Sequence, residues 1–212
     1  IVLDALDSSP HSKNTIIVLF SDHGFHLGEK QRWAKRTLWE DGTRVPIIIS
    51  APGFVAGQET KRPSELLDVF PTLLELAGLE ADPSQEGQSL VPLLENPTLR
   101  WAHPALSSFG PGNYAVRTTH YRFIQYHDGS QELYDHRIDP HEWNNLAGKP
   151  EMDRIIAEHA AHLPRWEKVV LRGKSTGHNA FKAANRRVEL FAHRAIRAGH
   201  AGRQLRGTDR QC

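Results

Sequence analysis

The first fifty residues contain two short apolar runs that predict β-strands. Residues 14–20 and 45–50 are rich in β-branched side chains and do not alternate with polar ones, a pattern typical of strands buried on both faces. Pro46 is tolerated at the start of the second strand, where no ladder hydrogen bond needs its nitrogen. Residues 1–6 have the apolar spacing of a helix that is already under way.

A helix is predicted after the second strand. Apolar residues recur at helical spacing between Ser64, which can cap the helix, and Gly78, which can end it. Pro71 inside this pattern predicts a kink or a break into two pieces. The order helix, strand, loop, strand, helix predicts part of a layered α/β domain with parallel strands over residues 1–100.

Beyond residue 100 the pattern changes to short alternating segments around a glycine-containing turn. This predicts an antiparallel meander with one buried face. Pro150 then leads a helix that runs to Pro164, and the tyrosines of the meander are expected to pack against it. Together they form a small antiparallel sheet with a C-terminal helix over residues 101–165. The strands are expected at residues 114–118, 121–126 and 132–134.

Charge is distributed unevenly along the chain. Residues 1–170 carry 16 Lys and Arg against 23 Asp and Glu, a balance of −7, and residues 171–212 carry 10 against 2, a balance of +8; the sum is the net charge of +1. Residues 166–212 therefore form a basic tail, with the spacing of a helix over 181–198. Basic faces of this kind can attract sulfated polymers, membranes or nucleic acid, but more often they are only solvated. Nucleic acid is not an expected partner.

Composition excludes several classes of protein. Apolar residues make up 39% and charged residues 24% of the chain, as in folded rather than disordered proteins. No run of about 18 apolar residues exists, so no membrane span is expected. The single cysteine, Cys212, excludes an internal disulfide framework and a cysteine-based zinc site. Because the chain starts with Ile1 inside a predicted helix, we expect it to be a piece of a longer protein.

The end of the first strand carries Ser21-Asp22-His23-Gly24. In open α/β sheets ligands bind at the carboxyl ends of strands, and a carboxylate beside an imidazole suits a divalent cation that further carboxylates complete. The same residues can also form a simple strand-ending turn capped by His23. His23 and His26 have the spacing of a zinc pair, but among 13 histidines that spacing is common by chance.

A charged segment follows at residues 29–36. Trp33 and Trp39 are unusual choices for a solvated loop that binds nothing. A lysine on such a loop, beside a cation, can hold a tetrahedral oxyanion as a point charge.

Several segments resemble, in unbroken order, the sulfatase family of the alkaline phosphatase-like superfamily. Residues 14–24 with Leu27-Gly28-Glu29, Trp33-Ala34-Lys35 and Thr43-Arg44-Val45-Pro46 are similar to the family's second metal-binding motif, especially in the iduronate-2-sulfatase-like branch. Further similar segments lie at residues 68–78, 87–94, 132–135 and 139–147. The resemblance covers residues 1–165 and corresponds to the C-terminal portion of a sulfatase.

The resemblance implies a role for four residues. Asp22 and His23 would be calcium ligands, and Lys35 would be a catalytic residue that binds the sulfate oxygens. His103, at the domain junction, would contact substrate. The chain has no Cys/Ser-x-Pro-x-Arg motif, so the formylglycine nucleophile and the remaining Ca²⁺ ligands are expected in an N-terminal part that is absent.

The implied function is hydrolysis of sulfate esters of a small molecule or glycan, with the chain inactive alone. The resemblance to the sulfatase family implies a periplasmic, secreted or lysosomal location. Two alternatives stay open at this point. The same site residues suit a phosphoester or phosphonate hydrolase of the superfamily, and the basic tail suits a non-catalytic module that binds anionic glycans.

Overall fold

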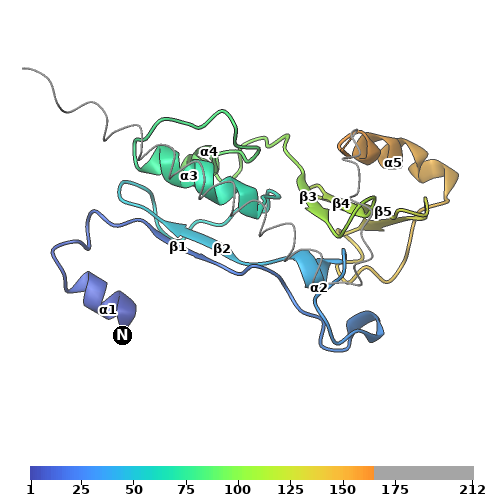
Figure 1. Cartoon of the computed structure of the whole chain (residues 1–212), viewed down its shortest axis with the longest axis horizontal. Coiled ribbons are helices and arrows are strands. Elements are labelled where there is room, and N and C mark those ends of the chain that lie inside the picture. Colours follow the sequence, from blue (N-terminus) through green and yellow to red (C-terminus); the bar gives the residue numbers. More distant parts are fainter. Residues whose placement is uncertain (165–212) are drawn as a thin grey trace, which may run out of the picture. The chain divides into compact units, whose positions relative to one another are not determined.

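The computed structural model describes residues 1–164, and Figure 1 shows their elements along the chain. Within these residues no helix has the length and apolar character to cross a membrane. The helix predicted in the basic tail lies outside the described residues. The helical segments are α1 (Val2–Asp7), η1 (Glu29–Gln31), α2 (Glu40–Thr43), η2 (Leu66–Asp68), α3 (Val69–Leu76), α4 (Val91–Glu95), η3 (Pro150–Met152) and α5 (Asp153–Ala160). The strands are β1 (Ile17–Phe20), β2 (Ile47–Ser50), β3 (Ala105–Ser108), β4 (Tyr114–Arg117), β5 (Tyr121–Gln125) and β6 (Gln131–Asp135).

Strands β1 and β2 form where they are predicted, but they pair antiparallel rather than parallel. Ile17 lies opposite Ser50 and Phe20 lies opposite Ile47. The chain leaves β1, turns back through the loop of residues 21–46, and enters its direct neighbour in the opposite direction, for which no crossover is needed. The α/β class is confirmed, and the parallel pairing is wrong for these two strands.

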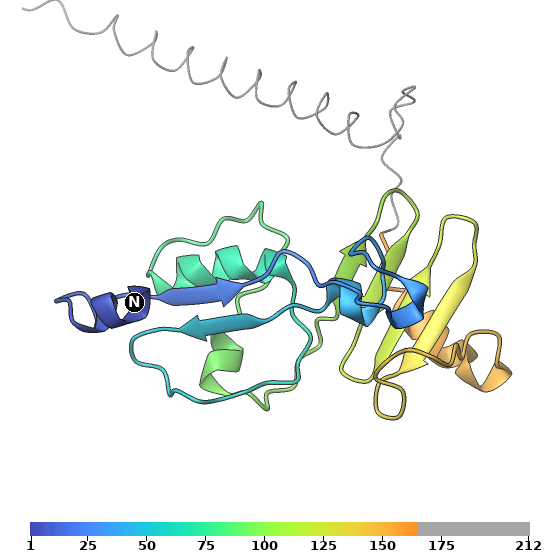
Figure 2. The same cartoon turned by 90° about the horizontal axis from the view of Figure 1, so that it is seen from below.

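The two strands are also less buried than their sequence predicts. Helices α3 and α4 lie on the same side of the pair in Figure 1, and Figure 2 shows the two strands side by side. Leu19, Phe20 and Ile48 nevertheless stay 54%, 51% and 59% exposed. A continuous apolar run indicates burial on both faces, but within residues 1–164 these side chains remain half open to solvent.

The helix predicted over residues 64–78 does break into two pieces, the 3-10 turn η2 and helix α3. The cap is Glu65 rather than Ser64: Glu65 and Asp68 form a reciprocal capping box. Pro71 lies in the first turn of α3, where its missing N–H is not needed. Gly78 ends the helix as predicted, with a φ of +66° that suits glycine.

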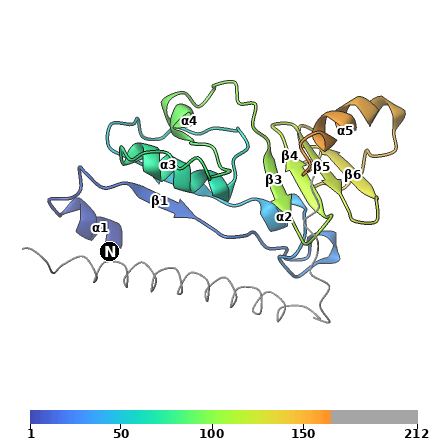
Figure 3. The same cartoon turned by 45° about the horizontal axis from the view of Figure 1, so that its top comes forward.

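The second half is an antiparallel sheet with strand order β3-β4-β5-β6. Figure 3 shows the four strands side by side. The meander is confirmed, but the sequence did not indicate β3, and burial is not confined to one face. The centres of β4, β5 and β6 are buried on both faces because their successive residues point to opposite sides.

Cross-strand register sorts the side chains of the sheet into two faces. Ala115 lies opposite Ile124, which lies opposite Glu132. The same alternation places Arg117, Arg122 and Tyr134 on the face of these residues, where Leu38 packs against Ala115, Ile124 and Tyr134. We call this the loop-facing side of the sheet. The other face carries the fully buried Val116, Phe123 and Leu133.

Helix α5 packs on this second face, against β5. The ring of His159 makes edge contacts with Tyr121 and Phe123, with centroids 5.9 and 6.5 Å away. The predicted packing of tyrosines against this helix is therefore correct for Tyr121. It is wrong for Tyr126 and Tyr134, which donate hydrogen bonds to Glu132 on the loop-facing side.

We expect His159 to make the fold less stable in acid. Burial lowers the pKa of His159, and its neutral form is bonded at both nitrogens: Nδ1–H donates to the Ile155 carbonyl and Nε2 accepts from Thr118 Oγ1, at 2.7 and 3.0 Å. The unfolded chain takes up the proton at about pH 6.5, the ordinary pKa of a histidine. Stability attributable to His159 is therefore complete above that pH and is lost as the pH falls toward the lower folded pKa.

Melting temperatures measured between about pH 8 and pH 5 would test this expectation. The acid-dependent fall should be shallower in His159→Gln than in the parent chain. His11→Gln, which changes an exposed histidine, should leave the profile unchanged. Equal profiles for all three proteins would contradict the assignment.

Candidate functional site

The site predicted at the end of β1 begins with a close approach between two backbone segments. The N–H of Gly24 donates to the carbonyl of Gly42, 3.1 Å away. A Cβ atom at residue 24 would lie 2.1 Å from the Asp41 carbonyl oxygen. Glycine is therefore needed at this position so that the chain leaving β1 can lie against α2.

Asp22, His23 and Lys35 converge on one atom, Nε2 of His23. The Nδ1–H of His23 donates to the Gly24 carbonyl at 2.7 Å, which leaves Nε2 with its lone pair. Lys35 Nζ lies 2.6 Å from this nitrogen and Asp22 Oδ2 lies 3.6 Å from it. The side chain of Asp22 is 82% exposed, so this corner is open to solvent.

The loop between β1 and α2 presents Lys35. Two backbone hydrogen bonds close it into a hairpin, from His26 to Ala34 and from Gly28 to Arg32, both 2.9 Å long. At its tip Lys30 and Gln31 have positive φ values of 50° and 57°. This region is costly for residues other than glycine, so other contacts must hold the tip in place.

Lys30 supplies these contacts by binding to the loop-facing side of the sheet. Its Nζ lies 4.7 Å from the ring centroids of both Trp39 and Tyr134, in range for cation–π attraction. The same ammonium donates to the Glu142 carbonyl. Trp39 in turn donates from Nε1 to Glu132, 2.7 Å away. Trp39 thus contacts a lysine of the same loop, whereas Trp33 remains 74% exposed.

A buried ionic network joins α2 to the same side of the sheet. Arg122 contacts both Glu40 and Glu142, the latter at 2.7 Å from Nε. Arg117 Nε lies 3.2 Å from Glu40, and His136 Nε2 lies 2.9 Å from Glu142. Burial alone would raise the pKa of Glu40, but Arg122 and Arg117 more than offset it and hold that pKa below its usual value. Glu40 is therefore ionised.

Sequence reasoning did not find this network, although a signal was present. Arg117 and Arg122 lie in the predicted strands, at positions that share one face once the two strands are paired. Two arginines on one face of a buried meander require acidic partners. The identity of these partners could not be predicted, because Glu40 and Glu142 lie 77 and 20 residues away from Arg117 and Arg122.

His103 is placed apart from these groups. It is exposed on the segment before β3, and its ring packs edge-on against Trp101 with centroids 5.0 Å apart. Within residues 1–164 the structure records no contact that joins His103 to Asp22, His23 or Lys35. Its role in substrate binding stays a prediction.

The chain is similar to known proteins over most of its length. The family model for the C-terminal part of N-sulphoglucosamine sulphohydrolase matches residues 28–168. A sulfatase of Formosa agariphila is 45% identical over 165 residues, which cover 77% of this chain and 32% of that protein. The chain thus spans about a third of the length of this curated relative.

Solved structures agree with this match. The structure of BT4656 in complex with its substrate D-glucosamine-2-N,6-O-disulfate superposes with a TM-score of 0.69 at 33% identity, covering 76% of this chain and 35% of that one. A phosphonate monoester hydrolase from Silicibacter pomeroyi gives 0.66 at 26% identity, covering 76% and 36%. The α/β fold is shared with BT4656 and with a phosphonate monoester hydrolase. The chain belongs to the sulfatase family, which confirms the resemblance at family level; the iduronate-2-sulfatase-like branch stays a prediction.

Proposed function

We propose that the chain is the C-terminal part of a metal-dependent sulfatase that hydrolyses sulfate esters of sugars. One observation carries this proposal: Lys35 Nζ and Asp22 Oδ2 both face Nε2 of His23. In this proposal Asp22 and His23 bind the cation, and the Lys35 ammonium beside them binds the anion. The sulfated glucosamine bound by BT4656, together with the matched family model, supports a sulfated sugar as the substrate class.

The donor atoms of Asp22 and His23 fit part of a divalent cation site. Asp22 offers exposed carboxylate oxygens, and the bond from Nδ1–H to Gly24 orients His23 so that Nε2 can act as a ligand. Ca²⁺ takes about six to eight oxygen ligands, so these two residues require further ligands. When bound, such a cation polarises the oxygens of the ester group.

Lys35 is suited to bind and orient the sulfate group. Its side chain is exposed, and its ammonium can exchange the bond to His23 for bonds to sulfate oxygens. A fixed positive charge at this position stabilises the charge that builds up on those oxygens as the S–O bond breaks. The attacking group must come from elsewhere, because the chain has no Cys/Ser-x-Pro-x-Arg motif.

We therefore expect the 212-residue chain alone to release no sulfate from 4-nitrophenyl sulfate or from N,6-O-disulfated glucosamine. Released sulfate can be measured by ion chromatography, with the Asp22→Asn chain as the blank. Turnover by the parent chain clearly above this blank would show that the residues present suffice for catalysis. It would contradict the proposal that the attacking group comes from elsewhere.

The positive test uses the intact gene product that contains this chain. It should hydrolyse the sulfated sugar faster than the corresponding phosphate or phosphonate monoester, and should lose activity with a chelator. A preference for the phosphonate would instead favour a phosphonate hydrolase. That second candidate is supported by the similarity to the Silicibacter pomeroyi enzyme.

A further inference from the structure

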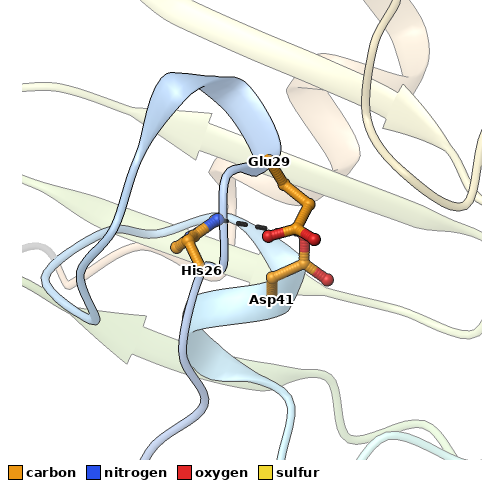
Figure 4. A group of neighbouring side chains, drawn as sticks. All are labelled: His26, Glu29 and Asp41. Atoms are coloured by element: carbon orange, nitrogen blue, oxygen red, sulfur yellow. Dashed lines mark ion pairs between the residues drawn. The ribbon is translucent and has the colours of Figure 1, made fainter.

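We propose that His26, Glu29 and Asp41 form a second divalent metal site, suited to Zn²⁺ rather than Ca²⁺, at the base of the loop that carries Lys35. One ligand atom from each of these residues lies within 4.8 Å of the others. Figure 4 shows the three side chains turned toward one another, with His26 and Glu29 on the hairpin and Asp41 on α2. The inference concerns residues separate from the Asp22–His23 pair and does not require the proposed function.

The first independent observation is a buried nitrogen without a hydrogen-bond partner. His26 is fully buried at 0% exposure, and its Nδ1 accepts or donates no hydrogen bond. This atom faces Asp41, whose Oδ2 lies 3.9 Å away. A buried polar atom of this kind is costly unless something satisfies it. A cation between Nδ1 and the carboxylates would do so.

The second nitrogen of His26 is held as in known metal sites. Nε2 lies 2.7 Å from Thr37 Oγ1. When Nε2–H donates to this hydroxyl, the Nδ1 lone pair is directed at the carboxylates, which is the tautomer that a metal ligand needs. Gly42 makes room for the pair, because a Cβ at that position would lie 2.4 Å from Thr37 Oγ1 and 3.3 Å from His26 Nε2.

Both carboxylates are available as negatively charged ligands. Backbone N–H groups of Glu29 itself and of Leu27 hold the pKa of Glu29 below its usual value, so this carboxyl is ionised at neutral pH. Glu29 uses Oε2 to accept from the Leu27 N–H and retains its other oxygen. Each carboxylate contributes one negative charge, and a divalent cation would balance the two.

The mixed donor set indicates the class of metal. One imidazole nitrogen and two carboxylate oxygens suit Zn²⁺ and similar first-row ions, whereas Ca²⁺ prefers more numerous oxygens. Tetrahedral Zn²⁺ with bonds of about 2.0–2.2 Å places its ligands about 3.4 Å apart. The 3.9 Å between His26 and Asp41 is close to this spacing. Water would complete the shell on the open side.

Such a metal would fix both ends of the loop that presents Lys35. His26 lies at the start of this hairpin, opposite Ala34. Asp41 lies in α2, where the loop ends. Metal binding at the base would restrict the positions that Lys35 can reach, without contact between the metal and any bound ester.

The test is a titration of the 212-residue chain with Co²⁺, a spectroscopic substitute for Zn²⁺. All proteins carry Cys212→Ser so that no thiol takes part. We expect visible d–d absorption from one tightly held ion, displaced by Zn²⁺ but not by excess Ca²⁺. Glu29→Gln and Asp41→Asn, which keep the shape of each side chain, should each weaken binding about tenfold or more. Zn²⁺ should also raise the melting temperature of the parent chain but not of these variants.

Two matched controls separate this site from other metal binding. Asp22→Asn removes a carboxylate from the neighbouring pair, and Asp82→Asn removes one that is exposed and bonded to Ser84 within its own turn. Both should leave the Co²⁺ spectrum and affinity unchanged. A missing band, or a band that survives in both Glu29→Gln and Asp41→Asn, would overturn the proposal. Because no sulfate ester is used, this outcome is independent of the proposed function.

Discussion

Replacing Arg122 with methionine is expected to lower the free energy of unfolding by about 3–5 kcal/mol, because it removes the cation shared by two buried carboxylates. Arg122 is 3% exposed, and it contacts Glu40 and Glu142 together. Without it, Glu142 keeps only His136 as an ion-pair partner among residues 1–164, and Glu40 depends on Arg117 and weaker contacts. Urea denaturation followed by circular dichroism would measure the loss.

The control for Arg122 is another arginine of the same subdomain. Arg137 pairs with Asp135, but its side chain is 52% exposed. Arg137→Met should therefore cost far less stability than Arg122→Met, because solvent screens an exposed ion pair. The double variant Glu40→Gln with Arg122→Met should regain part of the loss, because it removes one of the uncompensated charges. A cost below about 1 kcal/mol for Arg122→Met would show that the network does not hold the loop on the sheet.

Replacing Lys35 with alanine in the intact gene product is expected to lower kcat/KM for the sulfated sugar about 10²–10³-fold. The reason is the loss of the ammonium beside His23 Nε2, which in the proposed function holds the sulfate oxygens. Lys35 is exposed, so the folded state should keep its melting temperature. Initial rates of sulfate release at several substrate concentrations would give the change.

Two further variants serve as controls for the Lys35→Ala measurement. Lys149→Ala removes an exposed lysine near η3 and should leave the rate unchanged. Asp22→Asn should raise the Ca²⁺ concentration needed for activity, whereas Lys35→Ala should leave that concentration unchanged, since the two residues bind different partners. If Lys35→Ala retains the parental rate, Lys35 is not an anion-binding residue.

Local pattern predicted much of this fold, because each signal depends on neighbours in sequence. The apolar runs located β1 and β2, Gly78 ended α3, and alternation located three of the four strands of the meander. Strand direction and depth of burial depend on partners far along the chain. For this reason the pattern could not predict the antiparallel pairing of β1 with β2 or the half-exposed side chain of Phe20.

The residues of the candidate site show the same difference between local signals and contacts made only on folding. Asp22 and His23 were found because they are adjacent and follow a strand, and Lys35 was found through the family resemblance. His26, Glu29 and Asp41 come together through the hairpin of the loop, which no spacing rule describes. Glu142 reaches Glu40 from a distance of 102 residues. Only the folded chain brings such pairs into contact.

The loop-facing side of the small sheet has a consequence for how this protein can be divided. Lys30, Trp39 and Glu40 are all held by side chains that come after residue 115. A cut near residue 100 would separate the loop from its support and leave its charged groups without their counterparts. A shortened version of this protein therefore has to keep the loop and the C-terminal sheet together. A chimaera has to exchange the loop and the sheet as one unit.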